Sequence, residues 1–252
     1  MNDLKTIVMK FEGPLQSYGT SSHFEIRHTD PYPSKSAILG MIAAAMGIRR
    51  EETGQLADLD ALRIAVRVDQ VGHMSGDYHI AAKCKDKENF ERDAKKNYVT
   101  RRYYLEDAIF LVAVEGEDSL VDQSYEALKN PYFQLFYGRR SCSVNYDFLQ
   151  GIYTGSAIEQ LHQLPWMAAE WYQRRMRQEE IRLDIYADQA CLPNNRQKSL
   201  RRDEPKSFSQ LGRQHDFRFE VHENFVVKNP YWISQREISE TEHDAFAALS
   251  EE

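Results

Sequence analysis

"TIVMKFEGPLQSYG" at residues 6–19 and "PSKSAILGMIAAAMG" at residues 33–47 decide the fold class of this chain. The first stretch alternates along its apolar run and then reaches Gly13 and a proline, which predicts a strand that ends in a turn. In the second stretch Ser34 or Ser36 can cap a helix, whose apolar residues recur about every 3.6 positions up to the final glycine. The sequence therefore predicts a strand, a long loop and a helix.

Three further segments extend this pattern. Residues 62–69 alternate and residues 108–114 are apolar throughout, so both are predicted strands, and residues 119–129 are a predicted helix. The inferred order strand, helix, strand, strand, helix, strand fits an α+β, ferredoxin-like (RRM-like) domain with helices on an antiparallel sheet. We place this domain at residues 1–150 and a smaller β-rich region at residues 151–252.

Composition indicates a globular protein, with 42% hydrophobic and 12% aromatic residues in 252. There is no basic leader before an apolar stretch and no apolar run near the roughly 20 residues of a membrane span, so we expect a cytoplasmic protein without membrane contact. Cys84, Cys142 and Cys191 lie far apart and outside any ligand spacing. We therefore expect no metal, no cofactor and no disulfide framework.

The net charge of −7 argues against a nucleic-acid partner, but the charge is segregated along the chain. Residues 236–252 hold six acidic residues and one basic residue, whereas residues 83–104 hold eight basic and four acidic residues. The wider segment 77–104 is too charged for a core and too aromatic for a plain linker. It is expected to project from the body of the domain.

Several motifs occur in an order that is typical of one family. They are the opening stretch, "PSKSAILGMIAAAMGI" from residue 33, "DYH" at 77–79, "YGRRSC" at 137–142 and "RRDEP" at 201–205. Through them the chain resembles the CasD family of the RAMP superfamily, the subunits of type I-E CRISPR Cascade complexes that hold the 5′ handle of the guide RNA (crRNA). The resemblance covers most of the chain and is strongest over residues 7–150.

This resemblance implies an RRM-like body with a protruding β-hairpin, the thumb, at residues 77–104. It also implies a non-catalytic role in antiviral DNA targeting: binding the crRNA 5′ handle and capping the filament of Cascade backbone subunits. The implied partners are crRNA, the backbone subunit and the Cascade large subunit, with target DNA reached only through the assembled complex. Two features depart from the family: the thumb is mixed in charge, and the acidic C-terminal segment is longer than expected.

The start of the first predicted helix is a candidate phosphate site. Ser34, Lys35 and Ser36 offer two hydroxyl groups, an ammonium group and free helix amides, and Arg27 lies in the preceding loop. The alternative is an ordinary capped helix. Together with the family resemblance, these residues favour contact with RNA.

The other RNA-binding candidates are polar and aromatic residues of the loops and of the thumb. Gln16 and Tyr18 could meet an unpaired base, one by a hydrogen bond and the other by stacking. Adjacent arginines in an extended segment point to opposite sides, so one of each pair is free to reach phosphate. The candidates in these segments are Arg101, Arg102, Tyr103, Arg139 and Arg140. The sequence leaves open whether they read bases or grip only phosphates.

An alternative function is that of a metal-independent endoribonuclease that cuts CRISPR repeat RNA. Its candidate residues are Tyr78, His79 and Lys83, because such chemistry needs a base near the 2′-hydroxyl group and a cation at the phosphate. Adjacent residues of a strand face opposite sides, which separates Tyr78 from His79. A protein scaffold without RNA contact would explain the acidic segment but not the basic clusters.

Overall fold

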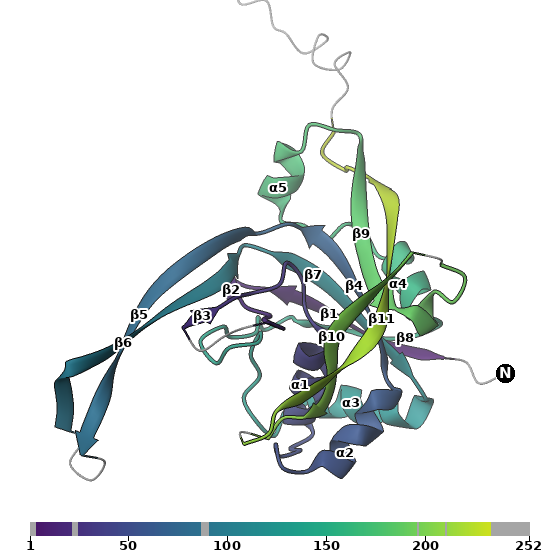
Figure 1. Ribbon diagram of the computed structural model, residues 1–252. Helices are drawn as coiled ribbons and strands as arrows, with labels where there is room; N and C mark the ends of the chain where they lie inside the picture. The colour runs from purple at the N-terminus through teal and green to yellow at the C-terminus, as the bar shows by residue number, and fades with distance from the viewer. Residues whose placement is uncertain (1–3, 22–24, 87–90, 196, 210, 233–252) are drawn as a thin grey trace, which may run out of the picture.

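The framework of the protein is a seven-stranded sheet, seen in a computed structural model that describes residues 4–21, 25–86, 91–195, 197–209 and 211–232 (Figure 1). The strands lie in the order β10-β11-β9-β4-β7-β1-β8, and neighbouring strands are antiparallel. Their bounds are β1 (Lys5–Glu12), β4 (Arg63–Gln70), β7 (Ile109–Gly116), β8 (Leu149–Thr154), β9 (Glu180–Asp188), β10 (Lys198–Ser207) and β11 (Gln214–Lys228).

The core lies on both faces of the three central strands, β4, β7 and β1. β7 is buried along its whole length, as its continuous apolar run predicts. On one face, Ile7 and Val112 pack with α1 (Lys35–Ala45) and near α3 (Asp118–Lys129). On the other face, Val8 and Leu111 pack with α4 (Ala157–Gln163). Helices therefore cover the sheet from both sides.

Helix α1 forms where the sequence predicts it. Of the two candidate serines, Ser34 is the N-cap, since its side chain accepts a hydrogen bond from the amide of Ala37. The helix ends before Gly47, whose φ of +79° is a conformation that favours glycine. The short helices α2 (Thr53–Asp58) and η1 (Leu59–Ala61) then lead into β4.

Strand β4 is the predicted second strand, and both of its faces are buried. Arg67, a polar position in the alternating pattern, is fully buried and pairs with Asp69 at 2.5 Å. Its guanidinium group also donates to the backbone oxygens of Leu161, Leu164 and Pro165, at the end of α4. At Arg67 and Asp69 the charged face of this strand thus packs against the C-terminal half of the chain, whereas Arg63 at the start of the strand stays partly exposed.

The predicted thumb is a long hairpin of β5 (His73–Asp86) and β6 (Glu91–Glu106) that extends away from the body (Figure 1). The segment predicted to project, residues 77–104, lies within this hairpin, which begins at His73 and ends at Glu106. At its base, β6 also pairs with β2 (Leu15–Gln16) and β3 (Ile26–Arg27). Both short strands lie in the predicted loop after β1.

The C-terminal half continues the main sheet. β8 pairs with β1, and β9 pairs with β4, so the sheet runs without interruption across the predicted boundary between residues 1–150 and 151–252. That boundary falls within β8 itself. The remaining elements are α5 (Glu170–Arg175) and η2 (Gln189–Cys191), while the acidic segment at 236–252 lies outside the described residues.

At the coarse level the predicted fold is confirmed: the chain is a mixed, sheet-rich fold of helices on an antiparallel sheet. In the part of the chain that the structure describes, no helix has the length and apolar character needed to cross a membrane.

Candidate nucleic-acid interface

Three segments that are distant in sequence meet at the base of the hairpin. β3 lies parallel to β6, which sets Ile26 beside Arg101 and Arg27 beside Arg102. The turn at residues 137–142 packs against both: the side chain of Arg139 contacts Arg27 of β3 and Tyr104 of β6. The structure thus brings together arginines that the sequence could only place in separate motifs.

One face of this junction is formed by Arg27, Arg102 and Arg139, which we call the arginine face. Nη2 of Arg139 donates to the backbone oxygen of Arg27 at 2.9 Å, and its Cζ lies 4.6 Å from the centroid of the Tyr104 ring. Arg102 lies on the Tyr104 side of β6, because residues two apart in a strand share a face. None of the three side chains forms an ion pair with a carboxylate of the described residues. The face therefore carries three positive charges that no ion pair among the described residues neutralises.

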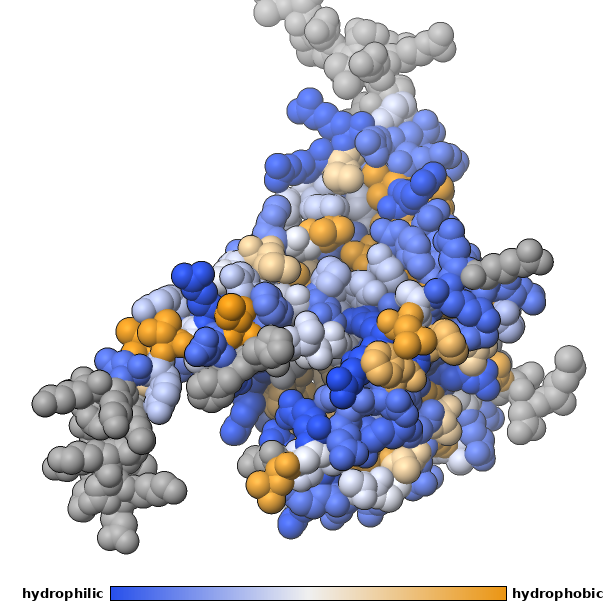
Figure 2. All heavy atoms as spheres, in the orientation of Figure 1, coloured by the Kyte–Doolittle hydropathy of each residue, from blue (hydrophilic) through white to orange (hydrophobic). Residues whose placement is uncertain are grey.

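The opposite face of the hairpin is aromatic and apolar. Tyr103 stacks on His28 with ring centroids 5.4 Å apart and the planes 6° apart, and it covers the flat backbone of Gly76. Further out along the same face, Tyr78 is 61% exposed and Ile80 is 53% exposed. Figure 2 shows hydrophobic side chains on the projecting hairpin. Arg101 lies on this face and Arg102 on the other, so that adjacent pair is split between the two faces as predicted.

The start of α1 is not a free phosphate site, which contradicts the prediction for Ser34, Lys35 and Ser36. The carboxylate of Asp203 already occupies the helix start and accepts the Lys35 amide at 2.8 Å. The ammonium group of Lys35 is buried and pairs with Asp188 at 3.2 Å and Glu204 at 3.0 Å. Ser34 caps the helix, and its hydroxyl group lies 3.1 Å from that of Ser36. The alternative interpretation, an ordinary capped helix, is correct.

Asp203 belongs to a buried cluster of charges that joins α1 to β10 and β11. Arg218 donates to Asp203 at 2.7 Å and to Glu220 at 2.6 Å, and it pairs with Asp188 at 3.0 Å. Burial alone would raise the pKa of Asp203, but its hydrogen bonds and ion pairs with Arg218 and Arg201 hold that pKa below the ordinary value. We call the set Lys35, Asp188, Arg201, Asp203, Glu204, Arg218 and Glu220 the ion clamp.

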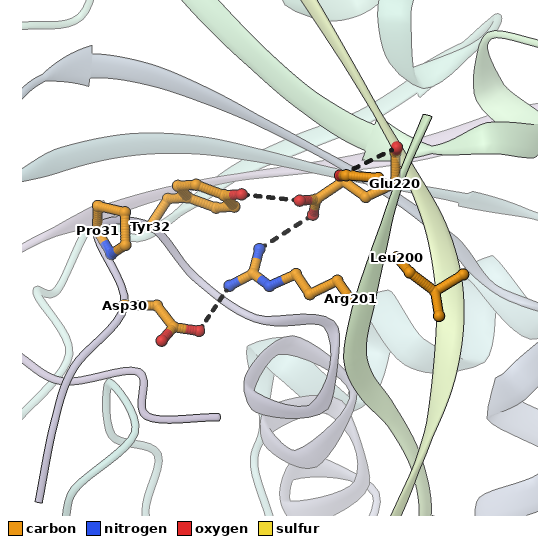
Figure 3. A pocket seen from close by; sticks show the side chains of 7 residues that line it. Asp30, Pro31, Tyr32, Leu200, Arg201 and Glu220 are labelled. Carbon is orange, nitrogen blue, oxygen red and sulfur yellow. Dashed lines mark hydrogen bonds and ion pairs between the residues drawn. The ribbon is translucent and has the colours of Figure 1, made fainter. Parts of the chain in front are cut away.

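At the edge of the ion clamp, Arg201 lines a pocket of about 280 Å³ with Asp30, Tyr32 and Leu200 (Figure 3). Its guanidinium group pairs with Asp30 and Glu220, each at 3.0 Å, and lies 4.3 Å from the centroid of the Tyr32 ring. The hydroxyl group of Tyr32 donates to Glu220 at 2.7 Å. Arg201 in the "RRDEP" motif is therefore neutralised within the fold and is not a recognition residue.

The predicted base contact by Gln16 and Tyr18 is wrong, because both side chains are in the core. Gln16 is 0% exposed, and its Nε2 donates to the backbone oxygen of Ala108 at 2.7 Å. Tyr18 is 2% exposed; its hydroxyl group donates to Gln16 at 2.6 Å and its ring packs edge-on against Phe110. Burial raises the pKa of Tyr18. Both residues anchor β2 and the residues that follow it to the core, and neither is exposed to a ligand.

The residues of the alternative catalytic set do not assemble in the described structure. Tyr78 lies opposite Arg101 on one face of the hairpin, whereas His79 lies opposite Thr100 on the other. Lys83 is in β5, but its side chain lies outside the described residues. Arg140, at the turn beside the arginine face, is exposed and stays a candidate for RNA contact.

Sequence reasoning missed one residue of this interface, His28, and did not predict the role of another, Tyr104. His28 was not singled out, although it lies next to Arg27 and stacks on a predicted aromatic candidate. Tyr104 supports the guanidinium group of Arg139, which requires knowing that residues 137–142 fold onto β6. The available signal was the adjacent pair Tyr103 and Tyr104 in the returning strand of the hairpin. The sequence did not show which of the two rings would support an arginine and which would stack on a histidine.

Comparison with known proteins gives consistent matches. A family model described as CRISPR-associated protein (Cas_Cas5) matches residues 6–221. The chain is 25% identical to the CRISPR system Cascade subunit CasD of Escherichia coli strain K12, over 91% of this chain and 98% of that protein. A solved chain of a CRISPR RNA-guided surveillance complex matches with a TM-score of 0.73 and 27% identity, over 93% of this chain and 96% of that one. A structure described as a Cas protein matches with a TM-score of 0.63 and 31% identity, over 90% and 97% of the two chains.

Proposed function

The chain belongs to the CRISPR-associated protein family Cas_Cas5, and from this premise we propose that it is the Cascade subunit that binds the 5′ handle of crRNA and caps the filament of backbone subunits. The proposal includes a cytoplasmic location and a role in antiviral DNA targeting by the assembled complex.

The observation that carries the proposal is the arginine face. Three guanidinium groups from β3, β6 and the turn at 137–142 converge at the hairpin base, and no described carboxylate pairs with them. Phosphate contacts by arginine supply most of the affinity for nucleic acid, and the aromatic pair Tyr103 and His28 on the other side of β6 suits the stacking of unpaired bases. A single-stranded handle is the RNA form in which phosphates and open base faces are both accessible.

The finer fold assignment is part of this proposal. The central strands lie in the order β8-β1-β7-β4, with α1 between β1 and β4 along the chain and α3 between β7 and β8. This order supports a ferredoxin-like, RRM-like domain, on which the hairpin is an insertion between the second and third strands. β9, β10 and β11 extend that sheet beyond β4.

The exposed face of the hairpin supports the proposed protein partners. Large apolar side chains that stay exposed in one contiguous area mark interaction sites. On this face of the hairpin these are Met74, Tyr78, Ile80 and Val99, each exposed by more than two fifths. We assign this face to the backbone subunit. The Cascade large subunit and, through the complex, target DNA complete the partners of the proposal.

We further propose that the subunit is not an enzyme. Tyr78 and His79 face opposite sides of β5, so the two side chains do not share one substrate phosphate. A cleavage assay on CRISPR repeat RNA without divalent metal tests this directly. Cleavage that stops on His79→Ala substitution would make the endoribonuclease alternative correct.

The decisive experiment measures affinity of the full chain for a single-stranded RNA with the 5′ handle and for the same RNA without it. The Arg27→Ala/Arg102→Ala double variant should weaken handle binding and lower the salt slope by about 0.7 for each lost phosphate contact. Arg175→Ala, an exposed arginine on α5, is the matched control and should change neither. Equal affinity for the two RNAs in the wild type would contradict handle recognition.

A further inference from the structure

The arginine face contains an unusual pair of unpaired donors. Among the described side chains, four buried polar atoms lack a hydrogen-bond partner, and two of them are guanidinium nitrogens of this face: Nε of Arg102 and Nη1 of Arg139. The other two are Asp60 Oδ1 and Ser124 Oγ. Guanidinium groups carry a permanent charge and only donate hydrogen bonds, so an unpaired buried nitrogen is costly.

Elsewhere the fold pairs its buried arginines fully. Arg67 meets Asp69 and three backbone oxygens, and Arg218 meets three carboxylates. At the hairpin base, by contrast, Asp77 lies directly across the strands from Arg102 but forms no ion pair with it. The missing acceptors at Arg102 and Arg139 are thus a local property of this face.

The two arginines also lie on the same face of the hairpin base. Arg139 is fixed between the backbone oxygen of Arg27 and the ring of Tyr104, and Arg102 lies beside Arg27 across the β3–β6 pairing. The side chains of Arg102 and Tyr104 share a face of β6, and Arg139 lies over Tyr104. Arg102 and Arg139 therefore flank one small area that has donors on both sides.

We propose that this area is a single phosphate site, in which Arg102 and Arg139 together bind one backbone phosphate of RNA. The inference rests on the proposed function and assigns its principal anchor. A phosphate offers several acceptor oxygens, and guanidinium groups bind such oxyanions through pairs of parallel hydrogen bonds. Nε of Arg102 and Nη1 of Arg139 are covered in the RNA-free protein, so binding supplies the acceptors they lack only when the two side chains move toward the phosphate. The positive side chain of Arg27 adds charge at the same place.

The test combines single-phosphate changes in the RNA with charge-conserving changes in the protein. Handle-bearing single-stranded RNAs, each with one phosphate replaced by a neutral methylphosphonate, are titrated with the full-length wild type, Arg102→Lys and Arg139→Lys. Lysine keeps the charge but loses the planar fork. Arg175→Lys on α5 is the control for a general loss of arginine.

We expect one position at which methylphosphonate weakens binding to the wild type about ten-fold or more, which is the effect of losing charge-assisted hydrogen bonds. At that position the methylphosphonate should reduce the RNA affinity of each lysine variant by a clearly smaller factor, because the lysine has already weakened the contact with that phosphate. At all other positions the methylphosphonate should reduce affinity as much as it does in the wild type. The RNA-free Arg102→Lys variant should keep the melting temperature of the wild type, which a structural arginine would not.

Two results would overturn the assignment in different ways. If handle-bearing RNA binds but no position is coupled to Arg102 or Arg139, the phosphate site is wrong and the proposed function stands; weakened binding of a neighbouring subunit to the lysine variants would then indicate a protein carboxylate as the occupant. If the wild type does not bind the handle at all, both fail. Should Arg139→Lys not fold, Arg102→Lys decides alone, since its Nε has no partner among the described residues.

Discussion

Replacing Asp203 by asparagine should lower the melting temperature strongly and leave RNA affinity per folded molecule unchanged. The carboxylate is fully buried, accepts the first amide of α1 and pairs with Arg218 and Arg201. Asparagine keeps the shape but removes the charge, so two buried guanidinium groups lose a common partner. The Asp203→Asn variant therefore tests whether the start of α1 is held by a structural carboxylate or serves as a phosphate site.

The expected size follows from the contacts. Breaking a buried ion pair by removing one partner costs about 3–5 kcal/mol, a large part of the roughly 5–15 kcal/mol that keeps a domain folded. For a chain of this length each kcal/mol shifts the melting temperature by about 2–4 °C, which gives a decrease of roughly 6–20 °C. Asp107→Asn is the control, because Asp107 is exposed and its φ of +53° suits asparagine equally well.

The pH dependence gives a second readout. The pKa of Asp203 is depressed in the folded state, so its stabilisation is fully present above the unfolded-state value of about 3.9 and is lost as the pH falls through the folded-state value. Thermal unfolding followed by circular dichroism should show a constant difference between wild type and Asp203→Asn from pH 7 to about pH 5. Below about pH 4 that difference should shrink. A variant that melts like the control but binds RNA poorly would refute the reasoning.

Three further outcomes are expected. Lys35→Met should lower the melting temperature by several degrees without changing RNA affinity per folded molecule, because it removes the cation paired with Glu204 and one of the two paired with Asp188; weaker RNA binding at unchanged stability would support a phosphate site at the helix start. Tyr18→Phe should cost about 1–3 kcal/mol in denaturant unfolding, since it leaves the buried oxygen of Gln16 without a donor, and a neutral result would contradict that role. The double variant Tyr78→Ser/Ile80→Ser should weaken association with the backbone subunit in native mass spectrometry at an unchanged melting temperature, and unaltered assembly would show that the hairpin face is not the contact.

The elements of the central sheet could be predicted because local patterns report burial. The alternating residues of β1, the continuous apolar run of β7 and the stripe of α1 each reflect how many faces of the element are covered. Pairing between distant strands leaves no such local signal. That β9 extends the sheet next to β4 depends on pairings between residues more than a hundred positions apart. The burial of Arg67 likewise depends on distant residues, those at the end of α4.

The candidate site shows the same limit in its charged residues. A serine, a lysine and a serine at a helix start have the chemistry of a phosphate site, and the sequence around them does not reveal that Asp203 folds onto the same amides. The arginine pairs were better predicted, because alternation in an extended segment places Arg101 and Arg102 on opposite faces whatever the fold. Which of them meets other arginines depends again on long-range contacts.

The two charged regions of the molecule differ in their ratio of acidic to basic side chains, and this difference favours the binding of a polyanion at only one of them. The ion clamp with the adjacent Asp30 has more carboxylates than cations: Asp30, Asp188, Asp203, Glu204 and Glu220 surround Lys35, Arg201 and Arg218. Its field therefore repels phosphate from the start of α1, while the unpaired guanidinium groups of the arginine face attract it. The loop from β2 to α1 connects the two regions through Arg27 and Asp30, three residues apart. Under the proposed function, an RNA strand that follows this loop is therefore expected to bind at its β3 end, beside the hairpin, and not at its helix end.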